Sequence, residues 1–109
     1  NLKLAWGTDL LFNPAANSKQ TATIPLMDKW FTPFEVLRMI THDNGELLAF
    51  SGKRSPYREG KLGVLEEGAY ADMILVDGNP LFNLKLMEDY NKNFTLIMKD
   101  GVVYKNTIK

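Results

Sequence analysis

An apolar run at residues 2–6 constrains the fold of this chain more than any other feature. It ends in Gly7-Thr8-Asp9, where a small-residue turn presents one carboxylate. This run, in which Lys3 is the one polar residue, predicts a strand of the buried type, which requires parallel neighbours. In parallel α/β barrels the active residues lie at the C-terminal ends of such strands. The run therefore predicts a buried strand with Asp9 at its catalytic end.

The carboxylate of Asp9 has a second interpretation. An Asp after Gly-Thr often caps the following loop or helix through its side chain. From the residues alone the capping role is the stronger one, and both roles stay open at this point. A barrel strand that ends in a catalytic carboxylate normally comes late in the chain, so we expect these residues to be the tail of a larger enzyme.

Composition excludes several classes of function. The chain has 109 residues and 45% hydrophobic content, enough for the core of one modest domain. Its 13 basic and 13 acidic residues balance, so the basic footprint of a nucleic-acid partner is missing. No cysteine is present, which excludes disulfides, thiolate zinc sites and cysteine nucleophiles. The apolar runs are too short to cross a bilayer, and we expect no membrane partner.

The middle of the chain predicts helices after a loop. Residues 10–24 are rich in Asn, Ser, Thr and Ala and predict a loop. Thr32 is then a helix N-cap, with Pro33 at the first helical position and Glu35 completing a capping box. Phe31 and Val36 have the spacing of a hydrophobic staple.

A second short helix is predicted over about residues 44–50, with Leu47, Leu48 and Phe50 as its buried contacts. The only histidine, His42, lies at the junction of the two helices. A lone histidine there indicates a surface or helix-terminal residue and not a metal ligand.

The remainder of the chain predicts a surface connection and then strands. Residues 51–63 are polar, basic and rich in turn residues. Residues 73–76 predict a strand covered on both faces. Residues 95–99 and 102–104 flank Asp100-Gly101, a strong signal for a type I′ hairpin. Between the two strand regions, residues 81–90 predict a loop with at most one helical turn.

Taken in order, these segments resemble the C-terminal part of the metal-dependent amidohydrolase superfamily. The most specific piece is LGVLEEGAYADMILVDGNPL at residues 62–81. The other matching pieces are Gly7-Thr8-Asp9, LRMIT at residues 37–41 with NGELL at 44–48, and IMKDGVVY at 97–104. Within the superfamily, SGKRSPY at residues 51–57 looks closest to the group of imidazolonepropionase and prolidase-type enzymes.

The resemblance implies an α+β fragment. Residues 1–60 would form the last strand and helices of a TIM-like (β/α)8 barrel, and residues 61–109 the C-terminal strands of a small composite β-sandwich. It also implies a metal-dependent hydrolase of C–N bonds (amide, peptide or cyclic amide). In the family, the aspartate at the position of Asp9 contacts a divalent metal, expected to be zinc, and shuttles a proton between the attacking water and the leaving group.

The resemblance also implies partners. The other metal ligands belong to strands upstream, so we expect this chain alone to hold no metal and to be inactive. Its partners would be the remainder of the barrel enzyme and a small amide or peptide-like substrate. Because the sandwich takes strands from both chain ends, its exposed edges would favour self-association or a homo-oligomer. The alternative is an autonomous, non-catalytic β-rich structural or interaction module, which residues 64–104 suit better than the first 50 residues do.

Overall fold

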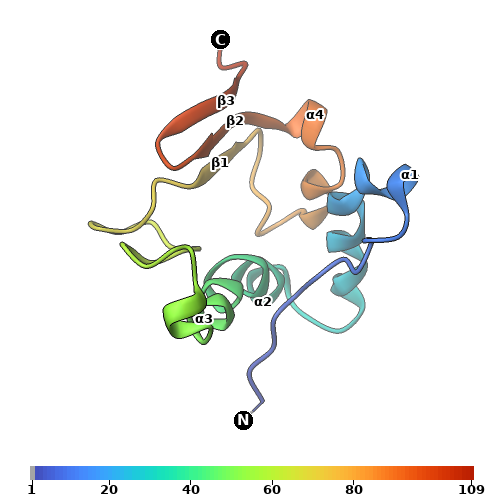
Figure 1. Cartoon of the computed structure of the whole chain (residues 1–109). Helices are drawn as coiled ribbons and strands as arrows, with labels where there is room; N and C mark the ends of the chain where they lie inside the picture. The colour runs from blue at the N-terminus through green and yellow to red at the C-terminus, as the bar shows by residue number, and fades with distance from the viewer. Residues whose placement is uncertain (1) are drawn as a thin grey trace.

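A computed structural model describes residues 2–109, with helical elements first and strands later in the chain (Figure 1). The elements up to residue 54 are α1 (Pro14–Asn17), the 3₁₀ helix η1 (Gln20–Lys29), α2 (Pro33–Arg38), the π-helical turn η2 (Met39–Asp43), α3 (Asn44–Ala49) and the 3₁₀ turn η3 (Gly52–Arg54). The later elements are β1 (Met73–Val76), the 3₁₀ turn η4 (Leu84–Met87), α4 (Tyr90–Asn93), β2 (Phe94–Lys99) and β3 (Val102–Asn106). The fold is α+β, with one three-stranded sheet.

The loop predicted over residues 10–24 is wrong, because α1 and the first half of η1 lie within it. Asn13 caps α1 by accepting a hydrogen bond from the Ala16 N–H at 3.2 Å. Burial of an apolar side chain stabilises η1, because Ile24 is only 4% exposed and joins the core. The loop was predicted because the segment is mostly polar, and its composition gave no indication that Ile24 would be buried.

The helix start at Thr32 is confirmed. Thr32 Oγ1 accepts from the Glu35 N–H at 3.3 Å, and the Glu35 carboxylate accepts from the Thr32 N–H at 2.8 Å. Val36 is fully buried, and Phe31 packs against the same cluster, as the staple predicts. Local signals alone determine where this helix begins.

The helix continues from α2 through the π turn η2 into α3. In the π turn the Asn44 N–H donates to the Met39 carbonyl, five residues earlier. The predicted burial of Leu47, Leu48 and Phe50 is wrong, because these side chains are 55%, 48% and 78% exposed. The buried residue of α3 is instead Gly45, since the main chain at Leu62 passes where a Cβ on residue 45 would have to lie.

The sheet is antiparallel, in the order β1-β2-β3. Asp100 and Gly101 have φ of 49° and 75°, which confirms the hairpin with both central residues at positive φ. The strand at residues 73–76 is confirmed, but its predicted burial on both faces is wrong. Ile74 and Leu75 are 50% and 51% exposed, because within residues 2–109 only β2 pairs with this strand.

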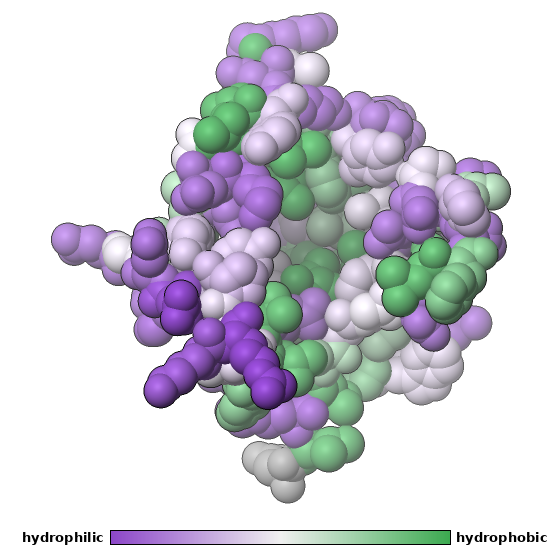
Figure 2. All heavy atoms as spheres, in the orientation of Figure 1, coloured by the Kyte–Doolittle hydropathy of each residue, from purple (hydrophilic) through white to green (hydrophobic). Residues whose placement is uncertain are grey.

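One core holds the two halves of the chain together. Ile24, Val36 and Met39 come from the helical half, and Leu84, Met87 and Phe94 from the later half. Residues 81–90, predicted as a loop with one turn, contain η4, which supplies the most buried leucine of this cluster, Leu84. Figure 2 shows apolar atoms around a hollow at the centre of the viewed face. Among residues 2–109, no helix is both long and apolar enough to cross a bilayer.

Candidate functional site

Asp9 lies in an extended segment that forms neither helix nor strand. Its φ is 51°, a left-handed conformation that Asp adopts more readily than most residues do. The carboxylate is exposed. The Asp9 side chain is therefore open to solvent, on a main chain with left-handed φ.

The buried strand predicted at residues 2–6 is wrong for this chain. Leu2 is 87% exposed and Leu4 is 39% exposed. A parallel strand needs a hydrogen-bonded neighbour on each side. Within residues 2–109 the three paired strands all lie between residues 73 and 106, and none of them reaches this segment.

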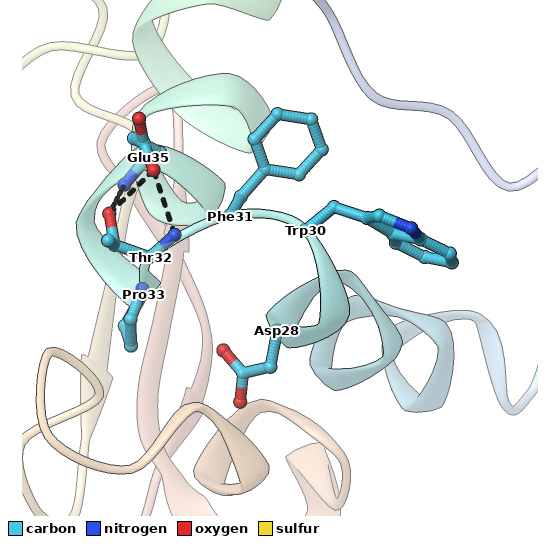
Figure 3. A pocket seen from close by; sticks show the side chains of 6 residues that line it. All are labelled: Asp28, Trp30, Phe31, Thr32, Pro33 and Glu35. Carbon is cyan, nitrogen blue, oxygen red and sulfur yellow. Dashed lines mark hydrogen bonds between the residues drawn. The ribbon is translucent and has the colours of Figure 1, made fainter.

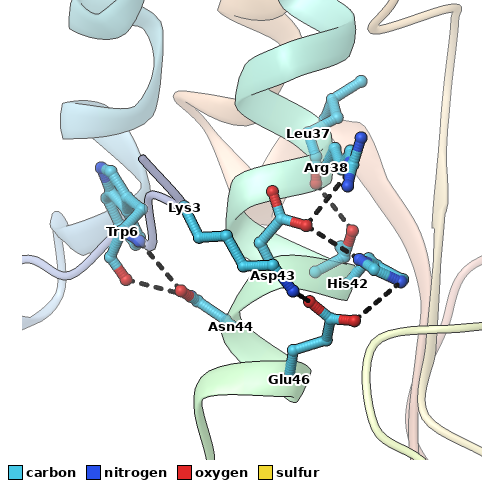
Figure 4. Close-up of polar contacts among 9 residues, drawn as sticks. Lys3, Trp6, Leu37, Arg38, His42, Asp43, Asn44 and Glu46 are labelled. Atoms are coloured by element: carbon cyan, nitrogen blue, oxygen red, sulfur yellow. Dashed lines mark hydrogen bonds and ion pairs between the residues drawn. The ribbon is translucent and has the colours of Figure 1, made fainter. Parts of the chain in front are cut away.

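A side chain takes the place of a neighbouring strand at Trp6 (Figure 4). The Trp6 N–H donates to Asn44 Oδ1 at 2.9 Å, and Asn44 Nδ2 donates to the Trp6 carbonyl at 3.0 Å. The Trp6 side chain is half-buried and packs against the core. The amide of Asn44 thus satisfies both main-chain polar groups of Trp6, three residues before Asp9.

A cluster of ligand-type side chains lies next to Asn44 on the same helix (Figure 4). Within residues 2–109, His42, Asp43 and Glu46 form the one group of three whose ligand atoms approach within 4.8 Å of each other. His42 Nδ1 lies 2.8 Å from Asp43 Oδ1, and His42 Nε2 lies 3.9 Å from Glu46 Oε1. Asp9 is not a member of this group.

Two cations already neutralise the carboxylates of this cluster. Arg38 Nε lies 3.0 Å from Asp43 Oδ1, and Lys3 Nζ lies 3.0 Å from Glu46 Oε2. The hydrogen bond from His42, with a smaller contribution from Arg38, holds the pKa of Asp43 below its ordinary value. The Lys3 ammonium does the same for the pKa of Glu46. Each carboxylate of the cluster thus has its own counter-charge, and the contacts are those of a surface ion-pair network.

An open depression of about 540 Å³ lies beside the start of α2 (Figure 3). Its lining residues are Asp28, Trp30, Phe31, Thr32, Pro33 and Glu35. The polar atoms of Thr32 and Glu35 are used in the capping box, and Lys29 Nζ lies 5.9 Å from the centre of the Trp30 ring. The depression brings together no pair of acid and base, and Asp9 is not part of its lining.

Comparison with known proteins decides the family. No family model and no curated protein sequence matches the chain. The crystal structure of an amidohydrolase matches all of this chain with a TM-score of 0.81 and 30% identity. The crystal structure of a prolidase complexed with N-methylphosphonate-L-proline matches 96% of the chain with a TM-score of 0.76 and 27% identity. The chain belongs to the amidohydrolase superfamily.

The match covers only part of these superfamily members. The chain spans 24% of the amidohydrolase and 23% of the prolidase. A structure of ochratoxinase from A. niger matches 81% of the chain with a TM-score of 0.66 and 24% identity, which supports the fold alone. The chain thus corresponds to about a quarter of an amidohydrolase-superfamily enzyme.

The contact between Asn44 and Trp6 was not predicted from the sequence. Asn44 was interpreted only as a helix start, although Asn in a helix interior is unfavourable because its side chain competes for main-chain hydrogen bonds. An Asn inside a continuous helix, followed by a glycine, was the available signal that residue 44 has a partner outside the helix.

Proposed function

We propose that this chain is the C-terminal segment of a metal-dependent hydrolase of C–N bonds in amides, peptides or cyclic amides. The observation that carries the proposal is the match of the whole chain to an amidohydrolase with a TM-score of 0.81. The prolidase match favours a peptide-like bond next to proline or a similar small residue among these substrates. The fragment alone is inactive, because most of the site lies in other parts of the enzyme.

In the complete enzyme, residues 1–60 form the end of a TIM-like barrel and residues 61–109 part of a composite β-sandwich. The exposure of residues 2–5 supports the first assignment, because an apolar segment without strand neighbours is suited to enter a parallel sheet. The half-exposed apolar side chains of β1 support the second, because a sandwich covers one face of each sheet with the other.

Asp9 is the residue of this chain that takes part in catalysis. A divalent ion, with zinc as the expected metal, would lower the pKa of a bound water and polarise the scissile carbonyl in the complete enzyme. Asp9 contributes one exposed carboxylate, which fits one position of such a site, and within residues 2–109 it belongs to no group of three ligand side chains. The remaining ligands therefore come from the rest of the enzyme, since a zinc site needs three or more protein ligands.

The proposed proton transfers are those that the family resemblance implies for the carboxylate of Asp9. Asp9 accepts a proton from the attacking water at one oxygen and then donates it to the leaving nitrogen. The exposure of its side chain leaves room for the attacking water and for the leaving group. A capping role for Asp9 receives no support, because the helix that follows, α1, is capped by the side chain of Asn13.

The partners of this chain follow from the same proposal. The remainder of the enzyme covers residues 2–6 and the open face of the sheet, and the substrate is a small amide or peptide. In isolation, the uncovered edges of β1 and β3 pair with a second copy of the chain. The alternative, an autonomous β-rich module, is opposed by the match of the whole chain, helices included, to an amidohydrolase.

The test uses the complete hydrolase that contains this sequence. We expect it to hydrolyse members of a panel of dipeptides, N-acyl amino acids and cyclic amides, and to lose activity with a chelator. Asp9→Asn should lower kcat by about 10²–10⁴-fold, because the amide cannot accept a proton. Asp77→Asn, an exposed carboxylate at the end of β1, is the matched control and should keep full activity. Undiminished hydrolysis by Asp9→Asn would refute the role of Asp9.

A further inference from the structure

The main chain just before Asp9 is fixed at one residue, Trp6. Both of its polar groups are bound by the Asn44 amide, at 2.9 and 3.0 Å, and its ring packs against the core. The hydrogen bonds join residues 38 positions apart. This contact joins the segment that carries Asp9 to the continuous helix formed by α2, η2 and α3.

Little else holds Gly7 and Thr8, the two residues that connect Trp6 to Asp9. A Cβ added at Gly7 would meet no atom within 4 Å, so nothing packs against that position. Thr8 Oγ1 donates to Gln20 Oε1 at 3.2 Å, but both groups are exposed. On the N-terminal side of Asp9, Trp6 is therefore the nearest residue that is firmly held, while on the C-terminal side the Leu10 carbonyl accepts from the Asn13 N–H at 3.1 Å.

The helix presents Asn44 through an irregular turn. The Asn44 N–H bonds to the carbonyl of Met39, five residues back, so η2 contains one residue more than an α-helical turn. Such π turns occur frequently at functional sites. The buried Gly45, against the main chain of Leu62, fixes the position of the next residue. Asn44 is thus held in place independently of its contact with Trp6.

We propose that Asn44 is a positioning residue for Asp9: its amide clamps the Trp6 main chain and so fixes the carboxylate at the reacting centre. This inference rests on the proposed function of Asp9. Displacement of a catalytic group by about 1 Å can lower a rate by roughly 10²-fold. An amide is suited to the clamp because it donates and accepts at the same time.

Two variants of Asn44 separate its two hydrogen bonds. Asn44→Ala removes both, whereas Asn44→Asp keeps the acceptor for the Trp6 N–H and loses the donor to the Trp6 carbonyl. In the complete hydrolase, Asn44→Ala should lower kcat by about 10–100-fold with KM changed by less than about threefold. Asn44→Asp should fall between the alanine variant and the unmodified enzyme. Asn91→Ala, an exposed asparagine in α4, is the matched control and should change neither value.

A second measurement tests the hydrogen bonds between Asn44 and Trp6 directly and does not depend on enzyme activity. In the 109-residue chain, NMR-detected hydrogen exchange should show the protection of the Trp6 amide reduced about tenfold in Asn44→Ala and preserved better in Asn44→Asp. Unchanged protection in Asn44→Ala would overturn the clamp. An equal loss of kcat in Asn91→Ala would also overturn the inference, since the effect would then be general destabilisation.

The outcomes distinguish the inference from the function on which it rests. If Asp9→Asn abolishes hydrolysis while both Asn44 variants keep full kcat, Asp9 is catalytic and the positioning role of Asn44 is overturned. If Asp9→Asn retains full activity, the proposed role of Asp9 falls and the inference falls with it. Parallel losses of kcat and of Trp6 protection across the Asn44 variants support both.

Discussion

Leu84 and Leu75 have the same side chain and opposite surroundings. Leu84, in η4, is 1% exposed and packs with core residues that both halves of the chain supply. Leu75, in β1, is 51% exposed on a sheet that has only three strands. The core is complete within this chain, whereas the sheet has a surface that the chain does not cover. The molecule therefore combines a self-sufficient interior with a surface suited to a partner.

The largest expected difference between the two regions is in the free energy of unfolding that is lost when a leucine side chain is truncated to alanine. Leu84→Ala should lower the free energy of unfolding by about 2–5 kcal/mol, because it removes a fully buried side chain and leaves a cavity. Leu75→Ala should change it by less than about 0.5 kcal/mol in the isolated chain. Urea unfolding of both variants measures the contrast. Equal losses would mean that the sheet surface is covered.

A smaller effect is expected at the start of α2. Thr32→Ala should lower the free energy of unfolding by about 1 kcal/mol, because it removes the N-cap acceptor. Hydrogen bonds from the Thr32 main chain and side chain hold the pKa of Glu35 below its ordinary value of 4.5. The stabilisation from Glu35 is therefore present above that ordinary pKa and is lost as the pH falls through the lowered one.

The matched variant for this pH dependence is Glu35→Gln, which cannot titrate at position 35. Its free energy of unfolding should fall less steeply between about pH 5 and 3 than that of the unmodified chain. Denaturant titrations at several pH values supply the comparison. Parallel pH profiles for the two proteins would show that Glu35 is not held by Thr32 in solution.

The smallest effect on stability, with a clear effect on association, is expected on the open sheet. Leu75→Lys should leave the free energy of unfolding within about 0.5 kcal/mol. It should also weaken self-association of the isolated chain, since a charge on an uncovered face opposes pairing. Sedimentation at increasing concentration tests this, with Lys99, already exposed at the end of β2, replaced by Arg as the control. A monomeric unmodified chain would contradict the prediction of self-association.

The elements that could be predicted from the sequence are those that are determined by residues nearby in the sequence. The capping box at Thr32 needs only residues within one turn, and the hairpin at Asp100-Gly101 needs only two positive φ angles. Residues 2–6 have an equally clear pattern, but a parallel strand requires partners that lie far away in sequence. The pattern is therefore wrong about this chain, and a barrel strand at residues 2–6 in the complete enzyme stays a prediction.

The candidate site divides in the same way. Asp9 was identified from its place after an apolar run and from the family resemblance, and its catalytic role stays a prediction. Asn44 was missed because its partner, Trp6, is 38 positions away and the π turn that aims it has no simple periodicity. The sequence pattern thus indicates the carboxylate of Asp9 and does not indicate the contact between Asn44 and the Trp6 main chain.

The π turn at Met39–Asp43 gives the helix an unusual sensitivity to length. An α-helix advances about 100° per residue, so deletion of one residue in η2 would restore regular α-helical bonding and rotate every later position by that angle. Gly45 would leave its contact with Leu62, and Asn44 would turn away from Trp6. Many substitutions at exposed positions of this helix should be tolerated, while a single deletion in η2 should not.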